Sequence, residues 1–430
     1  MPFEKLQKAV FFLIVFFLSS QVGLHFWPDF SKVSGIRIDY LSPTLYLLDV
    51  LIIIWLGMLR ALGRLGKIRI EIENRLFKLL LSLFILTLII NTFLARSPVA
   101  HIFEIVKLVE FGLFGWLVAK TFEKKDISVF VRVLALSAIV SSLLAIWQFI
   151  NQSSVGGLWY FFGERTFNIS TIGISTVNLD QQILRPYASF PHPNVLAFFL
   201  LVATIFNVLR LPYEKSLAIR TFLILSVMLS TVGLFLTFSR IIILLAICFF
   251  VYAIYAKGKR NVILAVLGAL GLLGAASILF SPDVLNTQFL LRGIDFRQEL
   301  LAQSFQIFLN NPYFGIGLNN FFIHQSALIK DISPILFQPP HNIFVIALLS
   351  LGIFGWWIIP YIFIRAIRAV REKVKLSKGE IRAFYRSILF ILISIMIVGM
   401  FDHFFLTLEQ GQIMLALVLG LSFADLRRKT

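Results

Sequence analysis

The sequence predicts an all-α polytopic integral membrane protein, and three features of its composition favour that fold class. Hydrophobic residues make up 59% of the 430-residue chain, charged residues only 14%, and the mean hydropathy is +0.89. Since about a quarter of a soluble globular chain is charged, the composition excludes a cytosolic domain and a disordered region. The single cysteine, Cys248, also excludes a secreted module held by intrachain disulfides.

The apolar residues are grouped into stretches that are long enough to cross a bilayer, which takes roughly 20 residues in an α-helix. We predict about 12 transmembrane helices in a single membrane domain that covers residues 1–430. The expected spans lie near residues 8–27, 43–59, 77–95, 99–119, 128–150, 192–209, 219–238, 240–256, 262–280, 342–365, 386–403 and 409–424. The motif TFSR at 237–240 must turn the chain between the seventh and the eighth span.

The basic residues indicate the orientation of these spans, because cytoplasmic loops are enriched in lysine and arginine. With both termini in the cytoplasm, 27 of the 39 basic residues lie on the cytoplasmic side and 9 on the outer side. We therefore expect both termini in the cytoplasm. The net charge of +17 follows largely from this topology, so we expect no nucleic-acid partner.

Two outer segments, residues 151–191 and 281–341, are longer than a connection between spans requires, and we expect the chemistry there. The second extracytoplasmic loop contains a stretch with the periodicity of an amphipathic helix on the membrane face. Its apolar positions are Ile294, Leu300, Leu301, Phe305 and Phe308.

Common cofactor motifs are absent from the sequence. There is no GxxxxGK[ST] loop, and Gly315-Ile316-Gly317 lacks the third glycine of a dinucleotide fingerprint. The six histidines are scattered along the chain without an HExxH motif. We therefore expect neither a metal nor another cofactor.

Two arginines are expected at the outer membrane interface. Arg185 lies in RPYASFPHPN just before the sixth span, and Arg240 ends TFSR. Guanidinium groups bind phosphate oxygens in bidentate fashion, so the pair would suit the pyrophosphate of a lipid-linked donor. The alternative for each arginine is contact with a phospholipid headgroup.

His341 opens the tenth span in QPPHNIF, where its imidazole could take a proton from an attacking hydroxyl. A structural role at the helix start is the alternative, and we expect helix capping by Asn194 and Asn342. Asp402 and His403 end the eleventh span on the same side, where the carboxylate could orient a histidine, bind a sugar hydroxyl or be solvated.

Three charged residues lie within the fourth span. Glu104, Lys107 and Glu110 are spaced by three, which places them at neighbouring positions of one helix. Unpaired charge is costly in a membrane, so we expect a structural ion pair, with a lipid-phosphate contact of Lys107 as the second interpretation.

These motifs together resemble the O-antigen ligase and O-antigen polymerase family of bacterial membrane glycosyltransferases. The most specific similarity is His341-Asn342, then nine residues (IFVIALLSL), then Gly352-Ile353-Phe354-Gly355, which matches a His-Asn and GxxG spacing in that family. RPYASFPHPN, TFSR and RQELLAQSFQIFLNNPYFGIGLNNF, which contains Arg297, support the resemblance over most of the chain.

The resemblance implies a glycan donor on undecaprenyl pyrophosphate in the inner bacterial membrane and transfer at its extracytoplasmic face. It implies that Arg185 and Arg240 bind the pyrophosphate and that His341 is the general base or orients the acceptor. Asp402, Arg297, Asn342 and Asn194 would support the site, and Gly352 and Gly355 would allow close helix packing. The reaction would be metal-independent and would invert the anomeric carbon.

The acceptor is not encoded in any motif of the sequence. The histidine-to-GxxG spacing favours a ligase that acts on a lipid A core or another surface acceptor, as in lipopolysaccharide biosynthesis. A surface-polysaccharide polymerase or a protein O-glycosyltransferase would use the same donor. A flippase of lipid-linked glycans is the alternative from another class, but it would place charged residues near the bilayer midplane.

Overall fold

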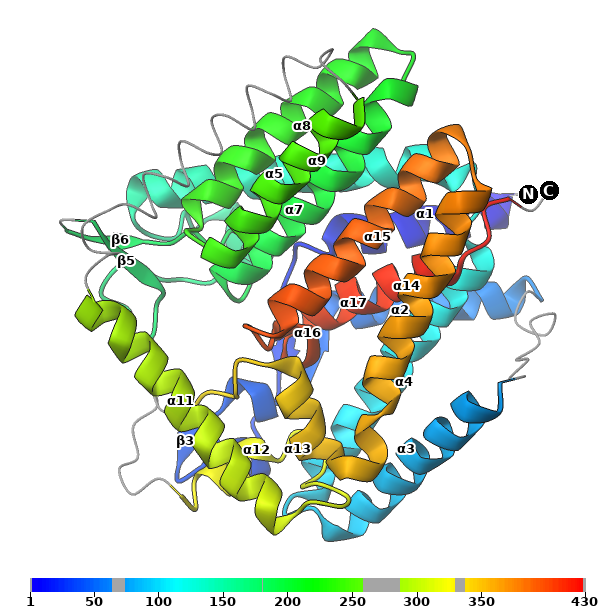
Figure 1. Cartoon of the computed structure of the whole chain (residues 1–430). Coiled ribbons are helices and arrows are strands. Elements are labelled where there is room, and N and C mark those ends of the chain that lie inside the picture. The colour runs from blue at the N-terminus through cyan, green and yellow to red at the C-terminus, as the bar shows by residue number, and fades with distance from the viewer. Residues whose placement is uncertain (1, 64–73, 180, 258–286, 329–336, 428–430) are drawn as a thin grey trace.

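The computed structural model describes residues 2–63, 74–179, 181–257, 287–328 and 337–427, and these are predominantly helical (Figure 1). The helices of ten residues or more are α1 (Pro2–Phe17), α2 (Leu47–Ala61), α3 (Arg75–Leu94), α4 (Pro98–Thr121), α5 (Asp126–Asn151), α7 (Pro193–Arg210), α8 (Leu217–Leu236), α9 (Arg240–Lys257), α11 (Thr287–Asn310), α13 (Ile343–Trp356), α14 (Ile358–Leu376), α15 (Gly379–Gly399) and α17 (Glu409–Phe423). Short helices are α6 (Leu158–Phe161), α12 (Phe321–Gln325) and α16 (Phe404–Thr407).

Five of the described helices are long and apolar enough to cross a membrane, namely α3, α5, α7, α8 and α15. The pair α13 and α14 would make a sixth span, but it is bent by 88° between the two helices. Helices α9 and α17 are apolar and shorter. Each predicted span in the described residues overlaps a helix, but the first two spans also include strand residues and the tenth is bent. The predicted span 262–280 lies outside the described part.

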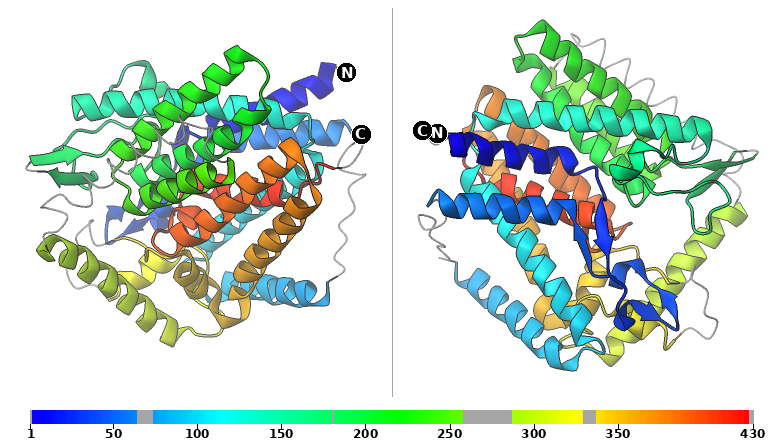
Figure 2. Two further views of the ribbon diagram at one scale, coloured as in Figure 1. Left: turned by 45° about the horizontal axis from the view of Figure 1, so that its top comes forward. Right: turned by 180° about the vertical axis from the view of Figure 1, so that it is seen from behind.

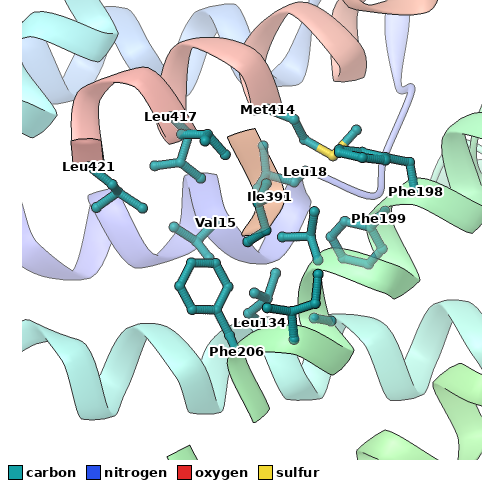
Figure 3. Packing of buried hydrophobic residues seen from close by; sticks show 14 of the residues in the cluster. Val15, Leu18, Leu134, Phe198, Phe199, Phe206, Ile391, Met414, Leu417 and Leu421 are labelled. Carbon is teal, nitrogen blue, oxygen red and sulfur yellow. The ribbon is translucent and has the colours of Figure 1, made fainter. Parts of the chain in front are cut away.

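Helix α7 forms the centre of the bundle. In its most apolar stretch 83% of the residues are buried, whereas the corresponding share in α3 is 17%. Figure 3 shows Phe198, Phe199 and Phe206 of α7 packed among apolar side chains of α1, α5, α15 and α17. Helix α3 is instead a peripheral helix that leaves most of its surface uncovered by protein.

The first predicted span is wrong in its boundaries. Helix α1 ends at Phe17, and residues 23–25, which the apolar pattern includes in that span, form strand β1 (Gly23–His25). Strand β1 pairs antiparallel with β4 (Thr44–Tyr46), which leads directly into α2. The residues between them carry a further small hairpin of β2 (Lys32–Val33) and β3 (Ile36–Arg37), so this connection is a third folded segment.

The two long predicted loops are also folded. The loop over 151–191 contains α6 and a hairpin of β5 (Thr176–Leu179) and β6 (Gln181–Leu184). The loop over 281–341 contains α11 and α12, so the helix predicted there is present. Along α11, Leu300 is buried, while Leu301, Phe305 and Leu309 form an exposed apolar stripe.

The start of α1 and the residues that follow α17 lie at the same end of the bundle (Figures 1 and 2). The β5–β6 hairpin lies at the opposite end in these views. The turn between α8 and α9 falls at the TFSR motif, as predicted, and Phe238 there has a φ of 52°. This arrangement brings the connection between α1 and α2 into contact with the segment over 151–191, through the Ser20 hydrogen bond to Phe162, and with the segment over 281–341, through the Asn319 hydrogen bond to Tyr40.

Candidate functional site

His341 is held at the start of α13 by the residue that follows it. The Asn342 side-chain oxygen accepts hydrogen bonds from the backbone N–H groups of Phe344, at 2.8 Å, and Val345, at 3.2 Å, which is the helix cap expected there. His341 Nε2 lies 3.3 Å from Gln338 Oε1. The other ring nitrogen, Nδ1, is buried and has no hydrogen-bond partner among the described residues.

Asp402 and His403 lie against His341. The rings of His341 and His403 have centroids 5.1 Å apart, and the His403 Nδ1 atom is 2.6 Å from Thr407 Oγ1. Asp402 Oδ1 accepts a 2.7 Å hydrogen bond from the backbone N–H of His403. The turn between α15 and α17 thus holds a buried carboxylate beside two imidazoles.

Asn194 joins this carboxylate to Arg185. Its Nδ2 group donates to Asp402 Oδ2 at 2.6 Å, and its Oδ1 atom accepts from Arg185 Nη2 at 2.7 Å. The prediction that Asn194 caps a helix is wrong, because the His192 side chain caps α7 by accepting from the Asn194 backbone N–H. The Asn194 side chain is therefore free to bridge two charged groups.

Arg185 is fixed by hydrogen bonds on three sides. Besides Asn194, its Nε group donates to the backbone oxygen of Thr237 at 2.6 Å, and Nη1 donates to Ser175 Oγ at 2.8 Å. Thr237 is the first residue of TFSR, so the two arginine motifs of the sequence are in direct contact. These bonds use three of the five N–H groups of the guanidinium and leave two for a ligand.

Arg240 and Arg297 are exposed and come from separate helices. Arg240 is the first residue of α9, and Arg297 lies in α11. Neither guanidinium forms an ion pair or hydrogen bond with a side chain in the described part of the protein. The positive charge of Arg297 nevertheless lowers the pKa of His341, which shows that α11 passes near the site.

The pKa values define the charge of the site near neutral pH. Burial lowers the pKa of His341 below its ordinary value, and Arg297 adds to this while Asp402 opposes it. Burial also lowers the pKa of His403 to about 3 and that of His192 to about 4. Burial acts to raise the pKa of Asp402, but the three histidines and the Asn194 amide lower it overall. Neutral imidazoles thus surround an ionised carboxylate.

Burial also acts on the buried arginine, where it lowers the pKa of Arg185 to about 10. Tyr187 and Asp402 oppose this shift, and the charge of Arg240 adds to it. The pKa remains well above 7, so Arg185 is protonated near neutral pH. The site therefore contains a fixed positive charge beside a neutral imidazole.

The view that the histidines are scattered is wrong in three dimensions, since three of the six surround Asp402. The ligand atoms of His341, Asp402 and His403 all lie within 4.8 Å of one another. Two imidazoles and a carboxylate are a ligand set that zinc uses, so a metal ion at this site would bind these three side chains. The sequence motifs give no reason to expect one.

Tyr40 also lies at the candidate site, although no sequence motif predicts it there. Its ring packs edge-on against His403, with centroids 5.7 Å apart, and stacks on Phe322 at 5.2 Å. The Asn319 side chain donates to the Tyr40 backbone oxygen at 2.8 Å. Burial, with the nearby Asp402 and Asp39, raises the pKa of the Tyr40 phenol, which keeps it protonated. No motif identifies this residue, because it comes from the connection between α1 and α2.

The GxxG motif forms the break that ends the straight part of α13. Gly352 has a φ of 59°, and a Cβ atom there would lie 2.3 Å from the Tyr313 backbone oxygen. The Ile316 N–H donates to the Leu349 oxygen at 2.8 Å, so the FGIG segment hydrogen-bonds to this break. A Cβ at Gly355 would lie 3.1 Å from the Cβ of Thr87 in α3.

The structural ion pair expected for Lys107 is present with Glu110, and Lys107 lies closer still to two acids from other helices, Asp49 and Glu409. Its Nζ atom is 2.6 Å from Asp49 Oδ1, 3.3 Å from Glu409 Oε2 and 3.8 Å from Glu110 Oε2. Glu104 accepts a hydrogen bond from Gln412 at 3.0 Å. These contacts join α2, α4 and α17 behind the turn that carries His403.

A comparison with protein families matches residues 225–360 to the family described as O-antigen ligase. This finding confirms the predicted resemblance for just under a third of the chain, including Arg240, Arg297 and His341. The match lies outside the segments that carry Arg185, Asn194 and Asp402. No curated protein is matched by the chain. The apolar helices and the family match together support a membrane protein that is similar to the O-antigen ligase family over residues 225–360.

Proposed function

We propose, from the O-antigen ligase match as premise, that this protein is a ligase-like glycosyltransferase. It moves a glycan from undecaprenyl pyrophosphate to an acceptor hydroxyl, on a lipid A core or another surface acceptor. Transfer takes place on the extracytoplasmic face of the bacterial inner membrane. The observation that carries the proposal is the buried, unpartnered Nδ1 of His341 beside Asp402 and the bridged Arg185.

His341 would accept the proton of the acceptor hydroxyl as that oxygen attacks the anomeric carbon. A neutral imidazole is required for this role, and the low pKa of His341 supplies it near neutral pH. Since the acceptor oxygen displaces the pyrophosphate from the opposite face in one step, the anomeric configuration is inverted. With its proton on Nε2, toward Gln338 Oε1, His341 would have the lone pair of Nδ1 available as the base, and the same contact would orient the acceptor.

The departing pyrophosphate gains negative charge, which fixed positive groups stabilise without rearrangement. Arg185 is held by three hydrogen bonds and has two N–H groups left for phosphate oxygens. Arg240 is exposed at the start of α9, where it would complete the phosphate contact, with Arg297 as a supporting charge. Asn194 would keep Asp402 from pairing directly with Arg185, so that the guanidinium stays available.

The test is transfer by the purified protein from a synthetic undecaprenyl-pyrophosphate glycan, with EDTA present. We expect product with the wild type and a loss of about 10²–10⁴-fold with His341→Ala, the range of a general base. Arg185→Lys should restore little of the transfer activity that is lost in Arg185→Ala, because lysine lacks the bidentate fork. If Arg185→Ala and Arg240→Ala each transferred glycan at the wild-type rate, the role of these arginines in binding pyrophosphate would be refuted.

The acceptor and the metal requirement are read from the same assay. Product that requires a lipid A core acceptor identifies a ligase, and longer lipid-linked chains without it identify a polymerase. Loss of activity in EDTA that is restored by a divalent metal would contradict the metal-independent reaction. That result would place a metal ion at His341, Asp402 and His403.

A further inference from the structure

A large cavity lies between the peripheral helix α3 and the rest of the bundle. Its volume is about 2370 Å³, which exceeds the roughly 300–1,000 Å³ of ordinary small-molecule pockets. Apolar side chains of α3, α4, α13, α14 and α17 form its walls. The low burial of α3 agrees with a helix that packs against something other than protein along much of its length.

One end of the cavity reaches the functional site. Tyr40, Phe322 and Thr407 line this end, and Thr407 is the hydrogen-bond partner of His403. The cavity walls then run along Leu108 and Leu113 of α4, toward the ends of α4 and α14 that lie away from the site. The two ends of the cavity therefore differ in chemistry.

The end away from the site is strongly basic. Seven of its lining residues carry a positive charge and three carry a negative charge, and each acid forms an ion pair with one of the bases. The pairs are Lys125 with Glu123, Arg210 with Glu380, and Arg427 with Asp425. Lys120, Lys124, Arg365 and Lys378 remain, and none of them forms an ion pair with a carboxylate in the described ranges.

We propose that this cavity binds an anionic phospholipid of the leaflet on the side away from the functional site. Its acyl chains would fill the space between α3 and the walls of α4, α14 and α17, and its phosphate would contact Lys120, Lys124 and Lys378. Basic pockets between transmembrane helices are known to bind anionic headgroups. The charge of the cavity end favours this occupant over a zwitterionic lipid. This lipid site is independent of the proposed transfer reaction.

The experiment measures lipid binding by the purified full-length protein in a zwitterionic detergent. Native mass spectrometry would follow titrations with phosphatidylglycerol and with phosphatidylcholine of the same acyl chains. We expect phosphatidylglycerol to bind at least tenfold more tightly. Each cationic side chain near the phosphate contributes about fivefold, so Lys120→Gln, Lys124→Gln and Lys378→Gln together should weaken binding about a hundredfold.

A matched variant loses three positive charges elsewhere. Arg220, Arg368 and Arg371 are exposed and do not line the cavity, so changing all three to Gln should leave phosphatidylglycerol binding unchanged. Equal losses from the two triple variants, or equal binding of the two phospholipids, would overturn the proposal.

The apolar wall is tested without changing any charge. Leu113→Trp would fill the cavity and should reduce phosphatidylglycerol binding, whereas Leu225→Trp on the exposed face of α8 should not. Undecaprenyl phosphate serves as a competitor. If bound phosphatidylglycerol were displaced by a lower concentration of undecaprenyl phosphate than of added phosphatidylglycerol, the cavity would hold a polyprenyl chain. The proposal would then be wrong.

Discussion

At the scale of single residues, the site depends on one chain of hydrogen bonds. Arg185, Asn194 and Asp402 are linked by two bonds of 2.7 and 2.6 Å, and Asp402 lies beside the His341 ring. Removing one partner from such a buried network leaves a charged group unsatisfied, which costs more than the bond itself is worth. The asparagine is thus as important to the geometry as the charged residues that it joins.

The sequence predicts His341, Arg185 and Arg240 as site residues because each lies in a motif, but it does not reveal which atoms they contact. The bridge through Asn194 and the approach of Tyr40 depend on contacts between residues more than 100 positions apart. The grouping of His192, His341 and His403 around Asp402 is of the same kind. Local patterns carry no information about such contacts, so these features emerged only from the tertiary structure.

Arg297 gives a prediction about pH that belongs to this scale. Its positive charge lowers the pKa of His341, so Arg297→Gln should raise that pKa. A base acts in its neutral form, and activity is lost as the pH falls through its pKa. The acid limb of the kcat/KM profile should therefore move to higher pH in Arg297→Gln.

The control for this shift is Arg96→Gln. Arg96 is also an exposed arginine, but its charge lowers the pKa of His324 and does not act on His341. The acid limb of the kcat/KM profile of Arg96→Gln should coincide with that of the wild type. An unshifted limb in Arg297→Gln would mean that His341 does not titrate in the rate-limiting step.

At the scale of secondary-structure elements, the helices were predicted well and the connections poorly. Apolar runs located α3, α5, α7 and α8 within two residues at each end, because helix length is set by the hydrocarbon thickness. The run predicted for α15 begins seven residues too late, because the helix starts in the charged segment before it. The error at α1 arose because GLHFW is as apolar as a helix, although it pairs as strand β1 with β4. Strand pairing across 20 residues is not visible in hydropathy.

The break at Gly352 gives a prediction for this scale. Its backbone conformation, φ 59° and ψ −174°, is almost exclusive to glycine, and the strain of another residue there is about 1–3 kcal/mol. A Cβ would also meet the Tyr313 oxygen at 2.3 Å. Gly352→Ala should therefore lower the thermal midpoint of the purified protein and the transfer rate, because α13 carries His341.

Gly57→Ala is the matched control for that substitution. Gly57 lies in α2, and a Cβ there would have no atom within 4 Å. Alanine is favoured over glycine in a helix by roughly 0.5–1 kcal/mol, so the midpoint should stay the same or rise. Equal losses from both variants would show that the break at Gly352 has no special role.

At the scale of the whole molecule, the orientation in the membrane remains a prediction from charge. The structure places the start of α1 and the residues that follow α17 at one end of the bundle and the β5–β6 hairpin at the other (Figure 2). This arrangement agrees with termini on one side and the site on the opposite side. The cluster of unpaired basic residues at the end of the cavity also lies among the segments assigned to the cytoplasm by their charge.

Labelling of single cysteines tests this orientation. In a Cys248→Ser background, Ser170→Cys lies in the exposed loop over 151–191, and Lys215→Cys lies in the exposed turn between α7 and α8. A membrane-impermeant maleimide added to spheroplasts should label position 170 at once and position 215 only after permeabilisation. The opposite pattern would place the functional site in the cytoplasm, where a glycan carried in the outer leaflet could not reach His341.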